Sequence, residues 1–171
     1  MKTLDRRGLL GGLAVAGAVA TAGSAVAEDR LLKLGDLKKD AEVACLYHCD
    51  FGDPARLNQM AGNLNNHLSI YDFDPFKVKL VVVAHGQGII QFLKDLEGTP
   101  WSAQKLDPAL FERFVALSKY GVEVFLCNIT FKNNKIDIGK ARSEPFIKIV
   151  PSGVATVAEL QGKGFAYLKV G

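Results

Sequence analysis

The stretch Gly121-Val-Glu-Val-Phe-Leu-Cys127 decides the fold class of this chain. Gly121 ends a helical pattern, and the apolar run after it is short and rich in β-branched and aromatic side chains. Such a run directly after a helix predicts a buried parallel strand. Cys127 stands where this strand stops, and residues 128–132 predict the first turn of another helix. Open α/β sheets place their reactive groups at this carboxyl edge, so the thiol is the first candidate for chemistry.

A cysteine that directly precedes a helix faces unpaired N–H groups and the positive end of the helix dipole. Both favour the thiolate, which is the nucleophilic form of the side chain. Free cysteine is also among the most buried residue types, so an inert packing role is the alternative interpretation of Cys127. The sequence therefore predicts Cys127 as a reactive thiol whose accessibility decides between the two interpretations.

Outward from this stretch, strand patterns alternate with helical ones. Helices are predicted from the capping pairs Asp53-Pro54 and Asp107-Pro108 and from Ser152, and a short helix is predicted over residues 89–96. This alternation predicts one α/β domain over residues 43–171, with a mostly parallel five-stranded sheet covered by helices on both faces. The predicted strands cover residues 43–48, 77–84, 122–126, 146–150 and 165–170.

Three segments have less definite patterns. Residues 98–105, which hold the only tryptophan, predict a loop or a poorly ordered insertion. Residues 136–143 are compatible with a short helix. Residues 28–42 are charged with a minor apolar component, which predicts either a linker or an amphipathic lead-in to the domain.

Residues 1–27 predict an export signal rather than part of the fold. The pair Arg6-Arg7 precedes a weakly apolar segment without charges, and Ala25-Val-Ala27 is a small-x-small cleavage site. Paired arginines before such a segment indicate the twin-arginine route, although the neighbours of the pair depart from the usual pattern. An uncleaved anchor is the alternative, but the apolar part is short. We expect a periplasmic protein with no stable membrane insertion after cleavage.

The charge balance excludes some partners. The chain has 21 Lys and Arg against 18 Asp and Glu. The leader takes three of the basic residues (Lys2, Arg6, Arg7) and one acidic residue (Asp5), which leaves 18 against 17. A nearly neutral domain gives no electrostatic reason to expect nucleic acid or an anionic membrane as a partner.

Two further segments, together with the strand that ends at Cys127, resemble a known protein family. These are Val81-Val-Val-Ala-His-Gly86 and the closing segment from Val150-Pro-Ser-Gly-Val154 to Tyr167. In this order they resemble the DsrE/DsrF-like family of small sulfur-handling proteins. The resemblance covers most of the chain after residue 40 and implies a flavodoxin-like variant fold assembled as a homo-oligomer, a trimer or hexamer. It also implies that Cys127 matches the cysteine that carries a persulfide in sulfur-relay members.

Three strand ends are predicted to meet near this thiol, because parallel strands share a carboxyl edge. His85 is a candidate stabiliser of a thiolate or a sulfur anion, with a hydrogen-bonded turn histidine as the alternative. Gly86 and Gly88 predict close backbone approach or a tight turn, and with Asn128 they are the candidate binding residues. His48 also ends a strand but has a weaker case.

The other two cysteines leave alternatives open. Three cysteines are an odd number, so at least one thiol is free, modified or paired between chains. Cys49 is a candidate resolving thiol for Cys127, and the alternative is a strand-end cysteine with no role. Cys45 lies inside a predicted strand and is assigned to packing. A zinc site built from His48, Cys49, His85 and Cys127 would have acceptable ligands, but the closely spaced pairs of structural zinc sites are missing, so we predict no metal.

Two functions follow from these observations. The first is a sulfur carrier in which Cys127 accepts sulfur as a persulfide and passes it on, with Cys49 and His85 as assistants. The predicted partners are sulfur donor and acceptor proteins, or sulfide or polysulfide. The carrier needs no organic cofactor, and the segment after His85 lacks the nucleotide-loop pattern. Such a carrier resembles a sulfurtransferase but is not a high-turnover enzyme. The second is a non-catalytic oligomeric module for binding or assembly, with structural cysteines.

Overall fold

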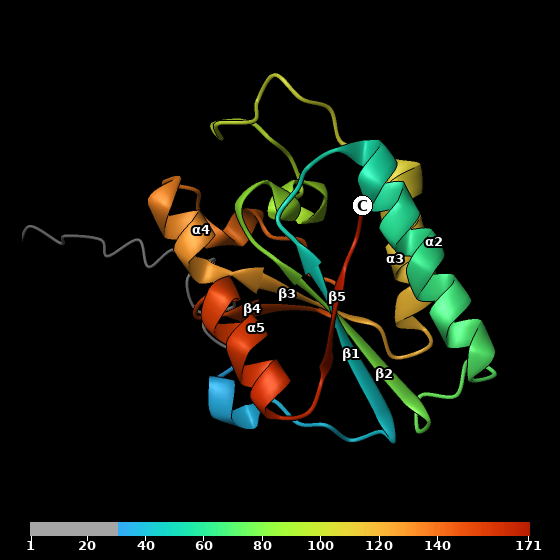
Figure 1. Ribbon diagram of the computed structural model, residues 1–171. Coiled ribbons are helices and arrows are strands. Elements are labelled where there is room, and N and C mark those ends of the chain that lie inside the picture. The colour runs from blue at the N-terminus through green and yellow to red at the C-terminus, as the bar shows by residue number, and fades with distance from the viewer. Residues whose placement is uncertain (1–30) are drawn as a thin grey trace, which may run out of the picture.

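Five parallel strands form the centre of the computed structural model, which describes residues 31–171 (Figure 1). The sheet order is β4-β3-β2-β1-β5, and every neighbouring pair is parallel. This arrangement confirms the predicted α/β fold. The predicted leader, residues 1–27, lies outside the described residues. The strands are β1 Val43–Cys49, β2 Val78–Ala84, β3 Glu123–Cys127, β4 Ile147–Val150 and β5 Ala166–Lys169.

The order of the strands decides which helix covers which face. From β1 to β4 each connection moves one strand in the same direction, and the last connection returns to the other edge. Because such connections are right-handed, a reversal of direction puts the helix on the opposite face. Helices α2 (Pro54–Ile70) and α3 (Pro108–Ser118) therefore pack together on one face, and α5 (Gly153–Gly162) covers the other (Figure 1). Flavodoxin itself has the order 2-1-3-4-5, so this sheet is a variant.

The predicted capping residues begin the three longer helices. The carboxylate of Asp53 accepts a hydrogen bond from the N–H of Arg56 at 2.8 Å, and Asp107 accepts one from Ala109 at 2.9 Å. Proline follows each aspartate at the first helical position, where a missing N–H costs nothing. Ser152 Oγ accepts from the N–H of Ala155 and begins α5. Side-chain capping therefore determines where these three helices begin.

Apolar side chains alternate between two cores, one on each face of the sheet. Along β1, Tyr47 belongs to the core under α2 and α3, and Leu46 belongs to the core under α5. Along β3, Leu126 and Phe125 divide in the same way. A shift of one residue in strand register would move every side chain of the strand to the opposite face and disrupt both cores. Burial of one such side chain contributes about 1.5–3 kcal/mol, so this shift would be costly. The alternation also fixes the face of each residue at the strand ends.

The segment after β2 differs from its prediction. A 3₁₀ helix, η2, covers Gly86–Phe92 instead of a helix over 89–96. Beyond it, Leu93 pairs as an isolated antiparallel bridge with Ala141, and the N–H of Lys94 donates to the carbonyl of Lys140 at 2.8 Å. This pairing holds the backbone extended and ends the helix early. The other short elements are η3 (Ile138–Lys140), inside the ambiguous segment 136–143, and α4 (Asn128–Asn133).

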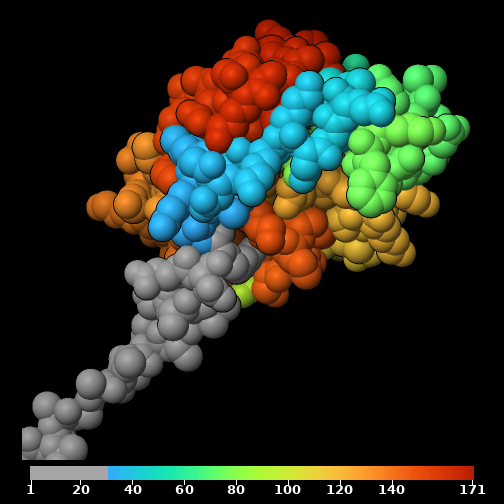
Figure 2. All heavy atoms as spheres, turned by 90° about the horizontal axis from the view of Figure 1, so that it is seen from below, coloured from blue at the N-terminus to red at the C-terminus, as the bar shows by residue number. Residues whose placement is uncertain are grey.

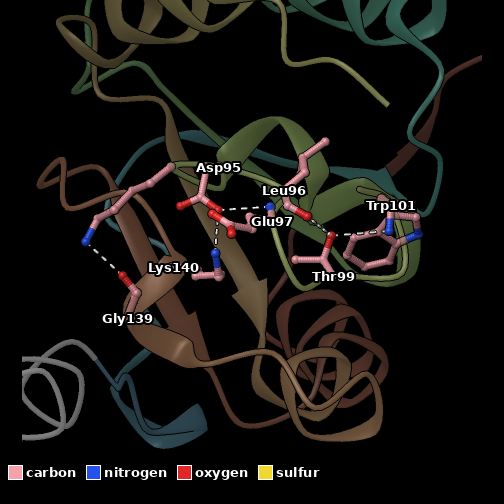
Figure 3. Close-up of polar contacts among 8 residues, drawn as sticks. Asp95, Leu96, Glu97, Thr99, Trp101, Gly139 and Lys140 are labelled. Atoms are coloured by element: carbon pink, nitrogen blue, oxygen red, sulfur yellow. Dashed lines mark hydrogen bonds and ion pairs between the residues drawn. The ribbon is translucent and has the colours of Figure 1, made fainter. Parts of the chain in front are cut away.

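The loop around the only tryptophan is ordered, so the alternative of a poorly ordered insertion is wrong (Figure 3). Thr99 Oγ1 donates to the carbonyl of Leu96 at 2.8 Å and accepts from the N–H of Trp101, whose side chain is buried. At the start of the loop Lys140 forms an ion pair with Asp95. These contacts tie the loop to the segment that contains η3.

Residues 31–42 lie against the domain (Figure 2). The N–H of Leu32 donates to the carbonyl of Ile149 at 2.8 Å, so the segment covers the β4 edge of the sheet. After a 3₁₀ turn, η1 (Leu34–Asp36), the side chain of Leu37 enters the core under α5. The Leu37 carbonyl also accepts a hydrogen bond from Lys163 Nζ at 2.8 Å. These contacts favour an amphipathic lead-in over a linker. Within residues 31–171, no helix has the length and apolarity needed to span a membrane.

Candidate functional site

Residues from three neighbouring strands meet on the α5 face at the carboxyl edge of the sheet. Ala84 pairs with Leu126 in the register of β2 and β3, so the next pair in this register is His85 beside Cys127. The backbone of His85 remains extended, and its N–H donates to the carbonyl of Cys49 at 3.0 Å, which continues the pairing with β1. Parallel strands lie about 4.8 Å apart, so His85 and Cys127 are direct neighbours.

Gly153, the first residue of α5, lies against both side chains. A Cβ atom added to Gly153 would lie 2.9 Å from Cβ of His85 and 3.2 Å from Cβ of Cys127. Both distances are closer than ordinary van der Waals contact, so only glycine lets the start of α5 approach this closely. The close approach sets the floor of the site and holds the imidazole and the thiol together.

A cavity of about 300 Å³ opens above them. It forms because β3 leads into α4, whose Phe131 packs in the core under α2 and α3, whereas β4 leads into α5 on the other face. Chain connections that leave neighbouring strands toward opposite faces create a crevice, which is where open α/β sheets bind ligands. The cavity is lined by His85, Gly86, Cys127, Ile129, Thr130, Asn133, Asn134, Ser152 and Val154.

Cys127 has the predicted position, at the end of β3 and the start of α4. Its side chain accepts no hydrogen bond from the first turn of α4, which has only six residues. The residue is 5% exposed, so a reagent reaches the sulfur only through the cavity. Nearby, the N–H of Gly86 donates to Thr130 Oγ1 at 3.0 Å and ties the loop after β2 to α4. Gly86 has φ +55°, a left-handed conformation that explains the predicted glycine.

His85 is hydrogen-bonded to a second histidine. His48 Nε2 lies 2.6 Å from His85 Nε2, and His48 Nδ1 lies 2.8 Å from the hydroxyl of Tyr167 on β5. Burial is the main cause that lowers the pKa of His85 below 6.5, and the positive charge of His48 lowers it further, while Asp50 acts in the opposite direction. His85 is therefore neutral at pH 7, and would act on a sulfur anion as an N–H donor rather than as a cation.

Cys49 lies on the other face of the sheet. Its side chain is fully buried with the core under α2 and α3, and burial raises the pKa of this thiol to about 12. Strand β2 separates it from Cys127, a distance of about 9.5 Å between strand axes, whereas a disulfide needs Cα atoms within about 7 Å. The structure does not bring the candidate resolving thiol to Cys127, and Cys45 shares the face of Cys49.

Of the three candidate binding residues, the structure places only one at the cavity. Gly86 lines the cavity with Cys127, whereas Asn128 does not. Gly88 lies on the opposite side, where an added Cβ would meet the carbonyl oxygen of Cys49 at 2.1 Å. Gly88 therefore serves the packing of η2 on β1.

Sequence reasoning underrated His48 and missed Tyr167 and Gly153. Strand parity could have found His48, because it shares the side of Leu46. Tyr167 becomes visible only once β5 is known to pair with β1, where it stands beside Leu46. Gly153 can be identified as a site residue only once the packing of α5 against the sheet is known.

Two further features of residues 31–171 bear on the site. A cavity of about 710 Å³ lies at the amino-terminal ends of β2 and β3 and is lined by neither cysteine nor histidine. The described residues contain no cluster of three or more His, Cys, Asp or Glu side chains that could hold a metal ion. The thiol and the two imidazoles therefore remain the chemistry of the site.

Comparisons with known proteins agree with this architecture. A solved structure of a protein of unknown function from Methanobacterium thermoautotrophicum, MTH1491, is similar with a TM-score of 0.58 and 21% sequence identity. The match covers 74% of this chain and 98% of that one, and at this identity it shows the fold alone. No curated protein matches the sequence. The model of the DsrE/DsrF-like family matches residues 50–170, from the end of β1 to the end of β5, and the chain belongs to this family.

Proposed function

We propose that this chain is a sulfur carrier that holds one sulfane sulfur as a persulfide on Cys127 and passes it to a partner. Membership of the DsrE/DsrF-like family supports a function of the sulfur-relay type. The observation that carries the proposal is the cavity that Cys127 shares with His85 at the carboxyl edge of the sheet. At about 300 Å³ it has the size of the smallest ligand pockets, which suits a sulfur chain or the tip of a partner's side chain.

Loading begins when the Cys127 thiolate attacks the outer sulfur of a donor persulfide. The bond from that sulfur to the donor's inner sulfur breaks, the bond to Cys127 Sγ forms, and the donor leaves as a thiolate with the electron pair. Unloading repeats the step with the acceptor thiolate as the nucleophile and Cys127 as the leaving group. Sulfur moves between thiolates without a net change of oxidation state, so the cycle needs no oxidant and no reductant.

Export and assembly belong to the same proposal. Export by the twin-arginine route to the periplasm rests on the sequence of residues 1–27. A homo-oligomeric state rests on family membership. The sulfur donor and acceptor are then partners that reach Cys127 in the periplasm.

Mass spectrometry tests the carrier function. The purified protein is incubated with inorganic polysulfide and should gain the mass of one sulfur atom, located on the peptide that contains Cys127. The variant Cys127→Ser should gain none, and the double variant Cys45→Ser/Cys49→Ser should load like the wild type. Equal loading of wild type and Cys127→Ser, or no loading of the wild type, would reject the proposal.

A second candidate function is a non-catalytic binding or assembly module. The exposed fraction of Cys127, only 5%, favours it. In that case Cys127 would be inert toward both polysulfide and alkylating reagents in the folded protein, so the same experiment distinguishes the two functions.

A further inference from the structure

A line of side chains crosses the sheet from the thiol to the solvent. In the order β3-β2-β1-β5, neighbouring strands contribute or lead into Cys127, His85, His48 and Tyr167. The last three are joined by hydrogen bonds of 2.6 Å and 2.8 Å. Tyr167, at the far end, is 40% exposed and lies on an edge strand. The line therefore connects a nearly buried sulfur with the surface.

The contact between the two imidazoles restricts their protonation. Between His48 Nε2 and His85 Nε2, one nitrogen must carry a proton and the other a lone pair. When both rings are neutral they therefore have opposite tautomers. Either His85 has its proton on Nε2 and a lone pair on Nδ1, or His85 has its proton on Nδ1 and His48 has its proton on Nε2.

His85 Nδ1 is the nitrogen that remains for the cavity. Within residues 31–171 the hydrogen bond of the His85 ring is that of Nε2 with His48, so Nδ1 has no partner, and no hydrogen bond joins it to Cys127 Sγ in this structure. His85 and Cys127 line the same cavity and are neighbours in register. In one tautomer Nδ1 can accept the thiol proton, and in the other it can donate a hydrogen bond to the thiolate.

We propose that His48 and Tyr167 are positioning residues that, through His85, conduct the proton of the Cys127 thiol to solvent. This inference rests on the proposed function, since it describes how the carrier's thiol becomes a nucleophile. It goes beyond that function because it assigns roles to two residues outside the cavity and to the tautomers of both rings.

Each proton moves by one position along the line. The thiol proton of Cys127 passes to Nδ1 of His85, and the proton on Nε2 of His85 passes to Nε2 of His48. The proton on Nδ1 of His48 passes to the hydroxyl oxygen of Tyr167, whose own proton leaves to solvent. The result is a thiolate in the cavity, one proton in solvent and three neutral side chains. Reprotonation follows the same path in reverse.

The surroundings of His85 favour this path over a stored imidazolium. Burial disfavours a positive charge on His85, as does a charge on His48, and Asp50 is the acidic group that opposes them. A thiolate–imidazolium pair would require His85 to hold that charge. The proton path along His85, His48 and Tyr167 avoids the charge, because every intermediate side chain ends neutral.

Nuclear magnetic resonance of ¹⁵N-labelled histidine tests the coupling. With the Cys127 thiol protonated, His85 should have its proton on Nε2 and His48 on Nδ1, and both should switch tautomer together when the thiol loses its proton as the pH is raised. Tyr167→Phe removes the acceptor for His48 Nδ1–H and should abolish the concerted switch. Tyr120→Phe is the matched control, because Tyr120 is 42% exposed and lies far from the site on the α3 side.

The rate of alkylation of Cys127 by iodoacetamide gives a second readout. Tyr167→Phe should lower this rate at pH 7 about two- to tenfold, the effect of one hydrogen bond. It should also shift the pH profile upward, which a merely structural residue would not do. Tyr120→Phe should leave both unchanged. If Tyr167→Phe behaves like Tyr120→Phe, or if the two rings hold the same tautomer, the inference is overturned.

The two proposals fail separately. Sulfur loading of Cys127→Ser and wild type tests the carrier, and the tautomer switch needs no sulfur compound. A wild type that switches tautomers but takes up no sulfur would reject the carrier and keep the proton path. A wild type that loads sulfur while Tyr167→Phe leaves tautomers and alkylation unchanged would reject the path and keep the carrier.

Discussion

Cys127 and Cys49 each end a parallel strand at the same edge of one sheet, yet their surroundings differ completely. Cys127 falls on the α5 face, where a cavity and two histidines adjoin it. Cys49 falls on the other face, fully buried under η2 and α2. Its thiol donates hydrogen bonds to the carbonyl oxygens of Phe51 and Gly88 at 3.6 and 3.8 Å. The difference teaches that strand parity, more than position along the strand, decides whether an edge cysteine is available for chemistry.

Reactivity should show the largest contrast. Burial raises the pKa of the Cys49 thiol to about 12, so this thiol stays protonated at pH 8. We expect iodoacetamide to label Cys127 in the folded protein at least about 10³-fold faster than Cys49, because burial keeps the Cys49 thiol protonated and away from the reagent. Peptide mapping after timed labelling measures this ratio, and labelling in urea is the control. Comparable rates for the two cysteines in the folded state would break the comparison.

The packing beneath Cys49 should show the next largest effect. Gly88→Ala places a Cβ against the carbonyl oxygen of Cys49, a backbone atom that cannot move without distorting β1. We expect the free energy of unfolding to fall by about 3 kcal/mol or more, as measured by urea denaturation.

Gly62→Ala is the matched control for this change. Gly62 lies inside α2, and its nearest contact would be 3.8 Å from the end of the Arg113 side chain. Alanine is the better helix former, so this variant should gain about 0.5–1 kcal/mol. If Gly88→Ala were as stable as the wild type, η2 would not be held against β1 as described.

These glycines also show how far the sequence predicts the molecule. Alternating strands and capping pairs were sufficient for the fold, because local patterns determine them. For Gly86 and Gly88 together, the sequence predicted either a tight turn or a close backbone approach, without deciding which glycine has which role. The structure separates them: Gly86 makes the left-handed turn beside Thr130, and Gly88 packs on Cys49.

The site was predicted less completely, because it depends on which strands become neighbours. The positions of Cys127 at the end of one strand and of His85 directly after another follow from local sequence patterns. The pairing of Tyr167 with His48 depends on the return of β5 to the β1 edge, a contact between residues 119 positions apart. The candidate partnership of Cys49 with Cys127 considered only strand ends and not the two faces.

On the α5 face, Gly153→Ala should have a moderate effect on stability and a specific one on the thiol. The added Cβ meets the Cβ atoms of His85 and Cys127 at 2.9 and 3.2 Å, a smaller overlap than that of Gly88→Ala, although these atoms move only together with the backbone. We expect a loss of about 1–2 kcal/mol in unfolding free energy together with a severalfold change in the Cys127 alkylation rate. Gly162→Ala, at the other end of α5 with no atoms within 4 Å, should leave the alkylation rate unchanged and cost no stability, since alanine is the better helix former. An unchanged alkylation rate in Gly153→Ala would show that the close approach of α5 does not position the thiol.

The smallest expected effect is the pH dependence of stability. Burial lowers the pKa of His85 on the α5 face and of His67 on the α2 face below 6.5. Below pH 6.5 the unfolded chain therefore binds more protons than the folded one, so the stabilisation present above pH 6.5 is lost as the pH falls toward the folded pKa values. The melting temperature should fall by a few degrees between pH 7.5 and 5.5.

Single variants show how much of the pH dependence of stability comes from the histidine on each face of the sheet. His85→Asn and His67→Asn should each flatten the curve of melting temperature against pH, because each removes one group that takes up a proton on unfolding. The His85 variant should also alter the pH profile of Cys127 alkylation, and the His67 variant should not, since His67 is hydrogen-bonded to Tyr47 on the opposite face. A thiol profile that responds equally to both variants would mean that the sheet does not separate the two regions.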